Sequence, residues 1–343
     1  MSSSSVQPPF PTQESDVKTN EELYQKFTDL VSSWPYSPAL STNKLYRHPD
    51  GWYTSLAPMV GTMVADACFT ARPTDIIVVT LPKSGTTWIK ALLYSTVHRR
   101  DHPVVDSSAH PFNSLGPHEC VNFLEYQLYT HNKIPDLDAL PDPRLFATHV
   151  PFASLPRSVL PSGCKIVYLC RDPKDTLVSL WSFANKFRVR RDGLEPLPIK
   201  AAADFFCDGV SSFGPYWDHV LGYWRAHLAH PERVLFFRYE QMSADPAAHV
   251  RKLAEFVGRP FSVEEEEEGA ADAIVKLCSF EHMTGLDATK YGKTETLIGA
   301  VDNSTFFRRG VVADWMNHMS PETARKIDDI TEAKFRGSGL LLI

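Results

Sequence analysis

The clearest pattern in the chain is a β-branched run that leads into a helical repeat. Residues 76–80 form a short apolar run with the composition of a buried strand. From Ile89 onward the apolar residues fall at positions i, i+3, i+4 and i+8, so they share one face of a helix. The pattern predicts a strand that enters a helix through the polar turn at residues 81–88.

Two later segments repeat this order of strand, polar turn and helix. Residues 164–170 form a second apolar run, after which Asp172 and Pro173 have the residue types of a helix N-cap and first turn. Residues 233–239 form a third apolar run, and the sequence predicts a helix over residues 245–257 after it. Three such units predict parallel strands joined by right-handed crossovers, which is a doubly wound α/β sheet.

The polar residues that follow the predicted strands indicate a binding site. A weaker strand at residues 144–148 leads directly to His149. Ligands of doubly wound sheets bind at the carboxyl ends of the strands. Because Lys83, His149, Arg171 and Tyr239 each follow a predicted strand, we expect them to meet at one edge of the sheet.

Elsewhere the pattern predicts four helices and one long loop. We expect the helices at residues 21–32, 121–129, 264–276 and 320–336. Residues 284–310 lack an apolar period, and a loop of this length is usually a functional lid or disordered.

Composition narrows the class of protein. The chain has 343 residues, 43% of them hydrophobic, and we expect one domain over residues 21–343 after a disordered Ser/Pro-rich tail at residues 1–20. The net charge of -6 argues against a nucleic-acid-binding protein. No apolar run approaches the roughly 20 residues of a membrane span, and the N-terminus lacks the apolar core of a secretory signal. We therefore expect a cytoplasmic protein without membrane or nucleic-acid partners.

The six cysteines are scattered and form no Cys-x-x-Cys pair. No histidine spacing near them suits zinc, so we expect reduced core thiols and no metal site.

The first turn, Lys83 to Trp88, has the chemistry of an oxyanion site. A strand that feeds a helix directs unpaired backbone N–H groups and the helix dipole at one point, and here an ammonium and hydroxyl groups are added. The order of residues differs from the Walker loop, because no glycine lies in the ten residues before Lys83. From residue types alone, an ordinary turn with a solvated lysine is the alternative.

Several motifs together resemble the cytosolic sulfotransferase family, and most closely its plant members. They occur in family order over about residues 45–340: Pro82-Lys-Ser-Gly-Thr-Thr-Trp88, Thr148-His149, Tyr168-Leu-Cys-Arg-Asp-Pro-Lys-Asp175, Arg238-Tyr239-Glu240, Lys276-Leu-Cys-Ser-Phe280, and Phe307-Arg-Arg-Gly310 with Asp314-Trp315. The resemblance implies a single-domain, P-loop-NTPase-like sulfotransferase fold.

The resemblance also implies the co-substrate, 3′-phosphoadenosine 5′-phosphosulfate (PAPS), used without a metal. Its 5′-phosphate would lie on the first turn and its adenine between aromatic side chains, while its 3′-phosphate would be held by cations and a hydroxyl. The residues implied are Lys83, Ser84, Gly85, Thr86, Thr87 and Trp88 for the 5′-phosphate side, Arg171, Ser179, Arg308, Arg309 and Gly310 for the 3′-phosphate, and Tyr239, Cys278, Ser279 and Phe280 for the base.

In the same resemblance His149 would be the catalytic base, and Lys83 would stabilise the leaving phosphate. With an ordinary pKa near 6.5, a histidine can accept a hydroxyl proton at neutral pH. The acceptor would be a small, largely apolar molecule with one reactive hydroxyl, such as a plant secondary metabolite or hormone. By family position its pocket would be lined by Phe123, Tyr126, Phe183 and Phe152.

Three positions depart from the family pattern. Arg309 replaces the usual lysine, which keeps the charge. Ala313 replaces the usual glycine, which matters only if its φ angle is positive. The animal family's dimer motif is absent after Trp315, with Met316 at the position of its lysine, so we expect a monomer.

Two alternatives make different predictions. A P-loop kinase or NTPase would need a Walker loop and Mg²⁺-dependent nucleotide binding. A non-catalytic nucleotide-binding protein on the same fold would keep the first turn without needing His149.

Overall fold

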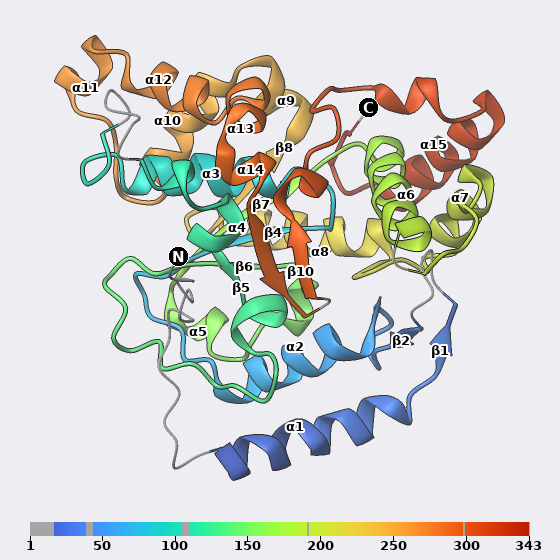
Figure 1. The fold of residues 1–343 in the computed structure, drawn as a ribbon. Helices are drawn as coiled ribbons and strands as arrows, with labels where there is room; N and C mark the ends of the chain where they lie inside the picture. The colour runs from blue at the N-terminus through green and yellow to red at the C-terminus, as the bar shows by residue number, and fades with distance from the viewer. Residues whose placement is uncertain (1–16, 39–43, 104–109, 191, 298, 343) are drawn as a thin grey trace.

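The computed structural model describes residues 17–38, 44–103, 110–190, 192–297 and 299–342 (Figure 1). Most of the predicted N-terminal tail, residues 1–16, lies outside this part of the chain. Residues 17–20 belong to helix α1 (Val17–Ser32), which begins four residues before the predicted start at residue 21.

A five-stranded sheet forms the centre of the molecule, and all its neighbouring strands pair in parallel. The order is β5-β6-β4-β7-β8, with bounds β4 Ile76–Thr80, β5 Asn122–Phe123, β6 Leu145–Thr148, β7 Lys165–Cys170 and β8 Val234–Arg238. The predicted doubly wound sheet is therefore confirmed. Strand β4 lies between β6 and β7, so the chain reverses its direction of winding there, and ligands of such sheets bind at that point.

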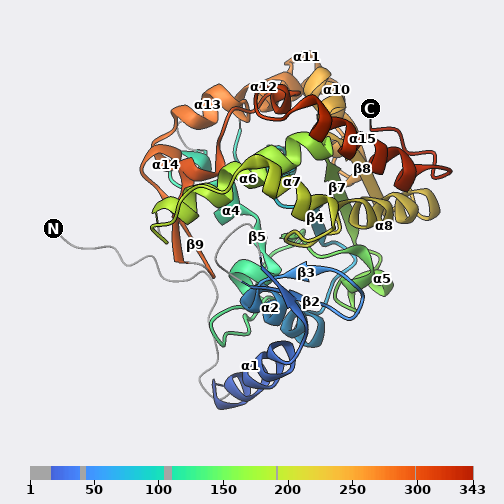
Figure 2. The same cartoon turned by 90° about the vertical axis from the view of Figure 1, so that its right-hand side faces the viewer.

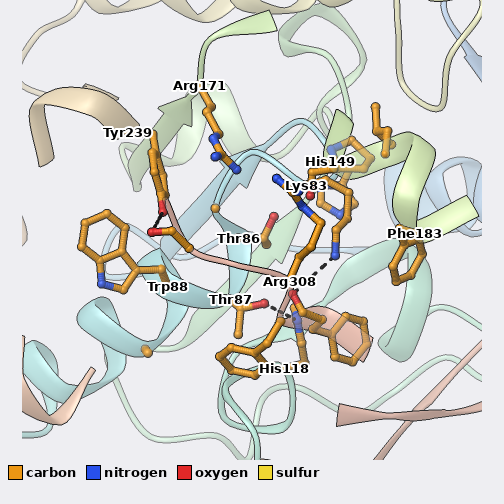
Figure 3. A pocket seen from close by; sticks show the side chains of 18 of the residues that line it. Lys83, Thr86, Thr87, Trp88, His118, His149, Arg171, Phe183, Tyr239 and Arg308 are labelled. Carbon is orange, nitrogen blue, oxygen red and sulfur yellow. Dashed lines mark hydrogen bonds between the residues drawn. The ribbon is translucent and has the colours of Figure 1, made fainter. Parts of the chain in front are cut away.

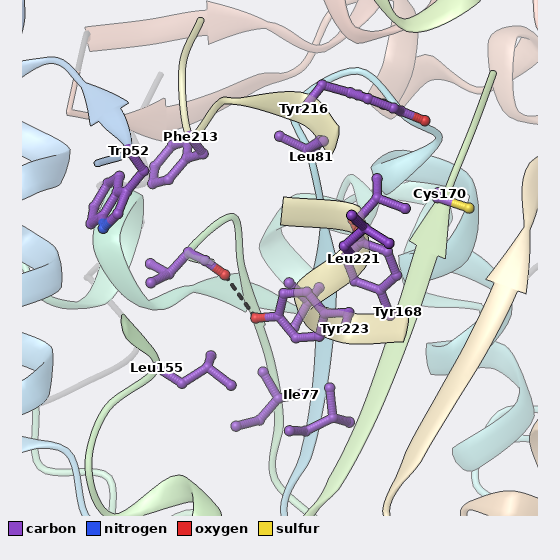
Figure 4. Close-up of a cluster of buried hydrophobic side chains, with 14 of the residues drawn as sticks. Trp52, Ile77, Leu81, Leu155, Tyr168, Cys170, Phe213, Tyr216, Leu221 and Tyr223 are labelled. Atoms are coloured by element: carbon purple, nitrogen blue, oxygen red, sulfur yellow. Dashed lines mark hydrogen bonds between the residues drawn. The ribbon is translucent and has the colours of Figure 1, made fainter. Parts of the chain in front are cut away.

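Helices cover both faces of the sheet, so the residues of its central strands are buried on both sides (Figures 1 and 2). Alternate residues point to opposite faces. One set, including Ile77, Tyr168 and Phe236, packs into a cluster with residues of α2 (Leu56–Cys68), α8 (Tyr216–Ala229) and α15 (Pro321–Phe335). In this cluster the Tyr223 hydroxyl donates to the Val150 carbonyl at 2.7 Å (Figure 4).

The other set packs against different helices. Ile76, Val167 and Leu235 lie in a second cluster with residues of α3 (Thr86–Val97), α10 (Pro246–Phe256) and α12 (Ala270–Leu277). Since α3 directly follows β4, this packing fixes the turn between them relative to the sheet.

Two of the helices begin where the sequence predicts. Helix α6 (Pro173–Arg190) starts at Pro173, and α10 starts after Asp245, whose side chain accepts from the Ala248 N–H at 3.1 Å. One short helix, α9 (Tyr239–Ala244), lies between β8 and α10 and was not predicted. It places Tyr239 at its first residue, directly at the strand end.

Three sequence predictions are wrong in part. The helix expected at residues 121–129 is the edge strand β5 followed by a π-helix over Leu124–Leu128, because Phe123 pairs with β6 instead. The helix expected at residues 264–276 is divided into α11 (Val263–Glu267) and α12 by Gly269, which has a φ of 72°.

The predicted loop at residues 284–310 also contains regular structure. It holds α14 (Asp287–Lys290) and an antiparallel hairpin of β9 (Lys293–Thr296) and β10 (Gly299–Asp302). These strands are too short and too polar to give a period-two signal.

The remaining elements connect this framework. They are β1 Tyr36–Ser37, β2 Leu45–Arg47, β3 Tyr53–Thr54, α4 Pro117–Cys120, α5 Val159–Ser162, α7 Ile199–Cys207, α13 Phe280–Gly285, and 3₁₀ turns at Pro111–Asn113, Phe152–Ser154, Asn303–Phe306 and Asp314–Asn317. Within the described ranges, no helix has the length and apolar character needed to span a membrane.

Candidate active site

The four polar residues that follow predicted strands meet in one cavity. Lys83, His149, Arg171 and Tyr239 all line a cavity of about 480 Å³ at the carboxyl edge of the sheet (Figure 3). The cavity lies beside β4, at the point where the winding reverses. The sequence prediction that these side chains converge is therefore confirmed.

The turn between β4 and α3 leaves backbone donors facing this cavity. Lys83 has a φ of 70° and Gly85 a φ of 106°, so the chain turns sharply before α3 begins at Thr86. A Cβ atom on Gly85 would lie 2.8 Å from the Tyr239 ring, so only glycine fits there. The first N–H groups of a helix have no partner within it, so the start of α3 has the donors that an anion needs.

Lys83 extends from this turn toward two aromatic side chains. Its Nζ lies 3.5 Å from the Phe306 carbonyl oxygen and 4.3 Å from the centre of the Phe183 ring. Burial and the positive charges of Lys186, Arg308 and Arg171 lower the pKa of Lys83 to about 7. The Lys83 amine should therefore take up a proton when an anion binds in the cavity.

His149 is held in the tautomer that a base requires. The Nδ1–H donates to the Thr80 carbonyl at 2.7 Å, which leaves the Nε2 lone pair free. Its backbone is fixed on both sides: its N–H donates to Glu125 Oε1 at 2.8 Å, and its carbonyl accepts from His219 Nε2 at 2.9 Å. Burial lowers the pKa of His149 to about 3, so the ring is neutral at physiological pH, unlike the value near 6.5 expected from sequence.

Arg171 is a buried cation with an unused donor. One guanidinium nitrogen donates to Asp175 at 3.2 Å and to the Val311 carbonyl at 2.7 Å, while Nε–H is buried with no partner among the described residues. Ser179, on the following helix α6, lines the same cavity. A guanidinium and a hydroxyl placed in this way suit a phosphate group.

Two further cations, Arg308 and Arg309, line the cavity from the C-terminal part of the chain. Arg308 and Arg309 both donate to Asp314, and Gly310 has a φ of 66°. A Cβ atom on Gly310 would lie 2.5 Å from the Phe280 ring. The carboxylate of Asp314 therefore orients both guanidinium groups, and the glycine allows the chain to pass close to the aromatic ring.

Ala313 has a φ of 62°, so the departure from glycine at this position carries backbone strain. Its N–H donates to Asp175 Oδ2 at 2.8 Å, and the Trp315 N–H donates to Oδ1 of the same carboxylate at 2.9 Å. These two bonds hold Ala313 in the left-handed conformation.

Aromatic side chains line another part of the cavity. The rings of Trp88 and Tyr239 meet edge to face at 5.3 Å, and the Tyr239 hydroxyl donates to the Gly310 carbonyl at 3.2 Å. Cys278, Ser279 and Phe280 line the same region of the cavity.

Three of the four predicted acceptor residues line the cavity, and one does not. The Phe123 ring lies 4.6 Å from the His149 ring and the Tyr126 ring 5.9 Å from it, and Phe183 lies against Lys83. Phe152 is not among the lining residues, because its ring packs on Tyr223 at 5.4 Å.

Of the other predicted site residues, all but Ser84 line the cavity. Ser84 is buried, and its hydroxyl lies 3.3 Å from that of Thr176. Thr86 and Thr87 line the cavity.

Sequence reasoning missed several lining residues. His118 precedes the predicted 121–129 helix by three residues, and Phe306 lies in the predicted loop. Their rings meet at 4.4 Å between centres. Thr294 and Val301 of the β9–β10 hairpin also line the cavity. The segments that contain these four residues have no periodic pattern, so no local signal in the sequence identifies the residues as part of the site.

Comparisons with known proteins agree with this geometry. The sulfotransferase domain family matches residues 73–339. Cytosolic sulfotransferase 16 of Arabidopsis thaliana is 42% identical over 324 residues, which is 94% of each chain, and cytosolic sulfotransferase 8 of the same plant is 43% identical over 315 residues, or 91% and 92% of the two chains.

Solved structures are similar as well. A crystal structure of a candidate steroid sulphotransferase from Arabidopsis thaliana has a TM-score of 0.73 and 36% identity, covering 98% of this chain and 99% of that one. A mouse sulfotransferase complexed with PAP (adenosine 3′,5′-bisphosphate) has a TM-score of 0.62 and 26% identity, covering 86% and 95%.

Proposed function

This chain belongs to the sulfotransferase family, and we propose that His149 is the base with which it moves a sulfuryl group from PAPS to a hydroxyl of a small acceptor. Sulfuryl transfer from PAPS is the family's activity, and the co-substrate agrees with the PAP bound in the mouse relative. The observation that carries the proposal is that His149, the Lys83 turn and Arg171 line one cavity.

The residues present fit a nucleotide with a phosphate at each end. The 5′-phosphate would lie on the N–H groups of the Lys83–Trp88 turn, and the base against Trp88 and Tyr239. The 3′-phosphate would be bound by Arg171 and Ser179 and covered by Arg308, Arg309 and Gly310. The buried Nε–H of Arg171 supports this, since a buried donor without a partner is costly until a ligand accepts from it.

In the reaction, the acceptor oxygen forms a bond to sulfur while the bond between sulfur and the 5′-phosphate oxygen breaks. The hydroxyl proton passes to Nε2 of His149, which is unprotonated because Nδ1 holds the ring proton. The leaving phosphate gains negative charge, which Lys83 and the helix N–H groups stabilise. Positioning and these fixed charges supply the catalysis, as in phosphoryl transfer.

The acceptor is a small molecule with a reactive hydroxyl, and we propose that it is largely apolar. Phe123, Tyr126 and Phe183 would contact it on the side of the cavity that faces His149. Flavonoids, steroid-like hormones and other hydroxylated plant metabolites would fit this description.

The cellular location and the oligomeric state of the protein are supported by different observations. The relatives are named cytosolic sulfotransferases, which supports a cytoplasmic location. The expected monomer remains a prediction from the motif missing after Trp315, where Met316 is 65% exposed.

The pH dependence of PAP binding tests the role of Lys83. A bound phosphate dianion should raise the pKa of Lys83 above its value of about 7 in the empty cavity, so binding at higher pH requires uptake of a proton. PAP affinity should therefore be highest near pH 7 and fall by up to about tenfold per pH unit from pH 7 to pH 9.

Calorimetric titration with PAP at several pH values measures this slope, and Lys83→Met is the matched control in which the slope should disappear. An equal slope in the variant would remove Lys83 from the phosphate site. Tighter binding of ATP with Mg²⁺ than of PAP would contradict the proposed function itself and favour a P-loop kinase.

A further inference from the structure

A buried lysine beside the phosphate turn has no carboxylate partner. Lys90 lies on α3, three residues after Thr87, and its side chain is fully buried. Its Nζ lies 3.2 Å from Nδ1 of His118 and 3.2 Å from the centre of the Phe123 ring. Among the described residues it forms no ion pair, and burial lowers the pKa of Lys90 well below its ordinary value, although Glu125 partly opposes this shift. Burying the amine costs free energy, and its hydrogen-bond partner among the described residues is His118.

His118 joins this lysine to the turn. Its ring is 5% exposed and lines the cavity, and its Nε2 lies 3.1 Å from the Thr87 hydroxyl (Figure 3). Burial, followed by the charges of Lys90, Lys83 and His149, lowers the pKa of His118, so the ring is neutral and carries one proton. Both ring nitrogens are therefore engaged, one by Lys90 and one by Thr87.

The position of that one proton decides what Thr87 can do. If Nζ of Lys90 donates one of its N–H groups to Nδ1, the ring proton is on Nε2 and is donated to the Thr87 oxygen. The Thr87 O–H is then free to donate into the cavity. If instead Nδ1 carried the proton, Nε2 would accept the Thr87 O–H, and Thr87 would present only lone pairs to an anion.

We propose that Lys90 and His118 are positioning residues that orient the Thr87 hydroxyl as a hydrogen-bond donor to the 5′-phosphate of the nucleotide. The inference rests on the proposed function, since it takes that phosphate to lie on the turn. Thr87 has no second hydrogen-bond partner among the described residues, which leaves its O–H available to the ligand. The arrangement places Lys90 behind the turn, joined to the anion by three hydrogen bonds: Lys90 to His118, His118 to Thr87, and Thr87 to the phosphate.

A double-mutant cycle on PAP affinity tests this chain of bonds. Thr87→Val removes the hydroxyl at nearly constant shape, and Lys90→Met removes the amine while keeping a buried apolar side chain of similar length. Each single change should weaken PAP binding by about tenfold, because each removes the same bond to a charged group. The double variant should bind no more weakly than Thr87→Val, and Thr87→Ser should bind like the wild type.

The controls separate the possible failures. Lys290→Met changes an exposed lysine and should leave affinity unchanged, and melting temperatures should show that each variant folds. If Lys90→Met does not fold, His118→Phe completes the same cycle with a ring of similar size. Losses that multiply to about a hundredfold in the double variant would show independent, structural effects and overturn the inference. Failure of the wild type to bind PAP would instead overturn the proposed function.

Discussion

Replacing His149 by alanine should lower kcat for sulfuryl transfer by about 10³-fold while PAP affinity stays within a few-fold of wild type. The physical reason is that Nε2 of His149 is free to accept the hydroxyl proton, whereas both ring nitrogens of His118, which also lines the cavity, are occupied by Thr87 and Lys90. Transfer of labelled sulfate from PAPS to a phenolic acceptor, at saturating nucleotide, measures the change.

The pH profile adds a second readout to this variant. Because the pKa of His149 is about 3, the wild-type kcat should not fall between pH 7.5 and pH 6 through protonation of this ring. His230→Ala is a suitable control, since that side chain is exposed and far from the cavity. Turnover within tenfold of wild type in His149→Ala would exclude the ring as the base. No transfer by the wild type to any hydroxylated acceptor, with PAP still bound, would favour a non-catalytic nucleotide-binding protein.

Replacing Arg171 by methionine should weaken PAP binding by about a hundredfold and AMP binding by only a few-fold. AMP lacks the 3′-phosphate, whereas PAP would receive the buried Nε–H and a second guanidinium N–H from Arg171. Hydrogen bonds to charged groups are worth about 1.5–3 kcal/mol each, which gives a loss of this size. Calorimetric titration of both nucleotides into both proteins provides the comparison.

Comparing the losses of PAP and AMP affinity separates a lost phosphate contact from a disturbed fold. Arg171 also bonds Asp175 and Val311, so a disturbed fold would weaken both nucleotides equally. Arg251→Met, which removes an exposed arginine on α10, should change neither. Equal losses for PAP and AMP in Arg171→Met would place the 3′-phosphate elsewhere.

The central part of the fold was predictable because its strands are buried on both faces. An apolar run such as residues 76–80 has few alternatives to a central parallel strand, and the structure has β4 with the same bounds. The residue after each such strand is then placed by topology alone. That is why Lys83, His149 and Arg171 could be assigned to one edge without any knowledge of their contacts.

The rest of the site depends on contacts that no local pattern records. Lys90 looks like an interrupting polar residue in an apolar helix, and only the tertiary structure places His118 against it. Phe152 was assigned by its family position, but in the structure its ring packs on Tyr223 and does not line the cavity. The low pKa of His149 likewise follows from burial, which the sequence does not express.

A crystal structure of the protein with PAP tests the central claim most directly. The account predicts the 5′-phosphate on the Lys83–Trp88 turn and the 3′-phosphate within hydrogen-bond distance of Arg171 Nε and the Ser179 hydroxyl. His149 Nε2 should face the open space beside the 5′-phosphate, where an acceptor hydroxyl would bind. PAP bound in the reverse orientation, or with its 3′-phosphate away from Arg171, would contradict it.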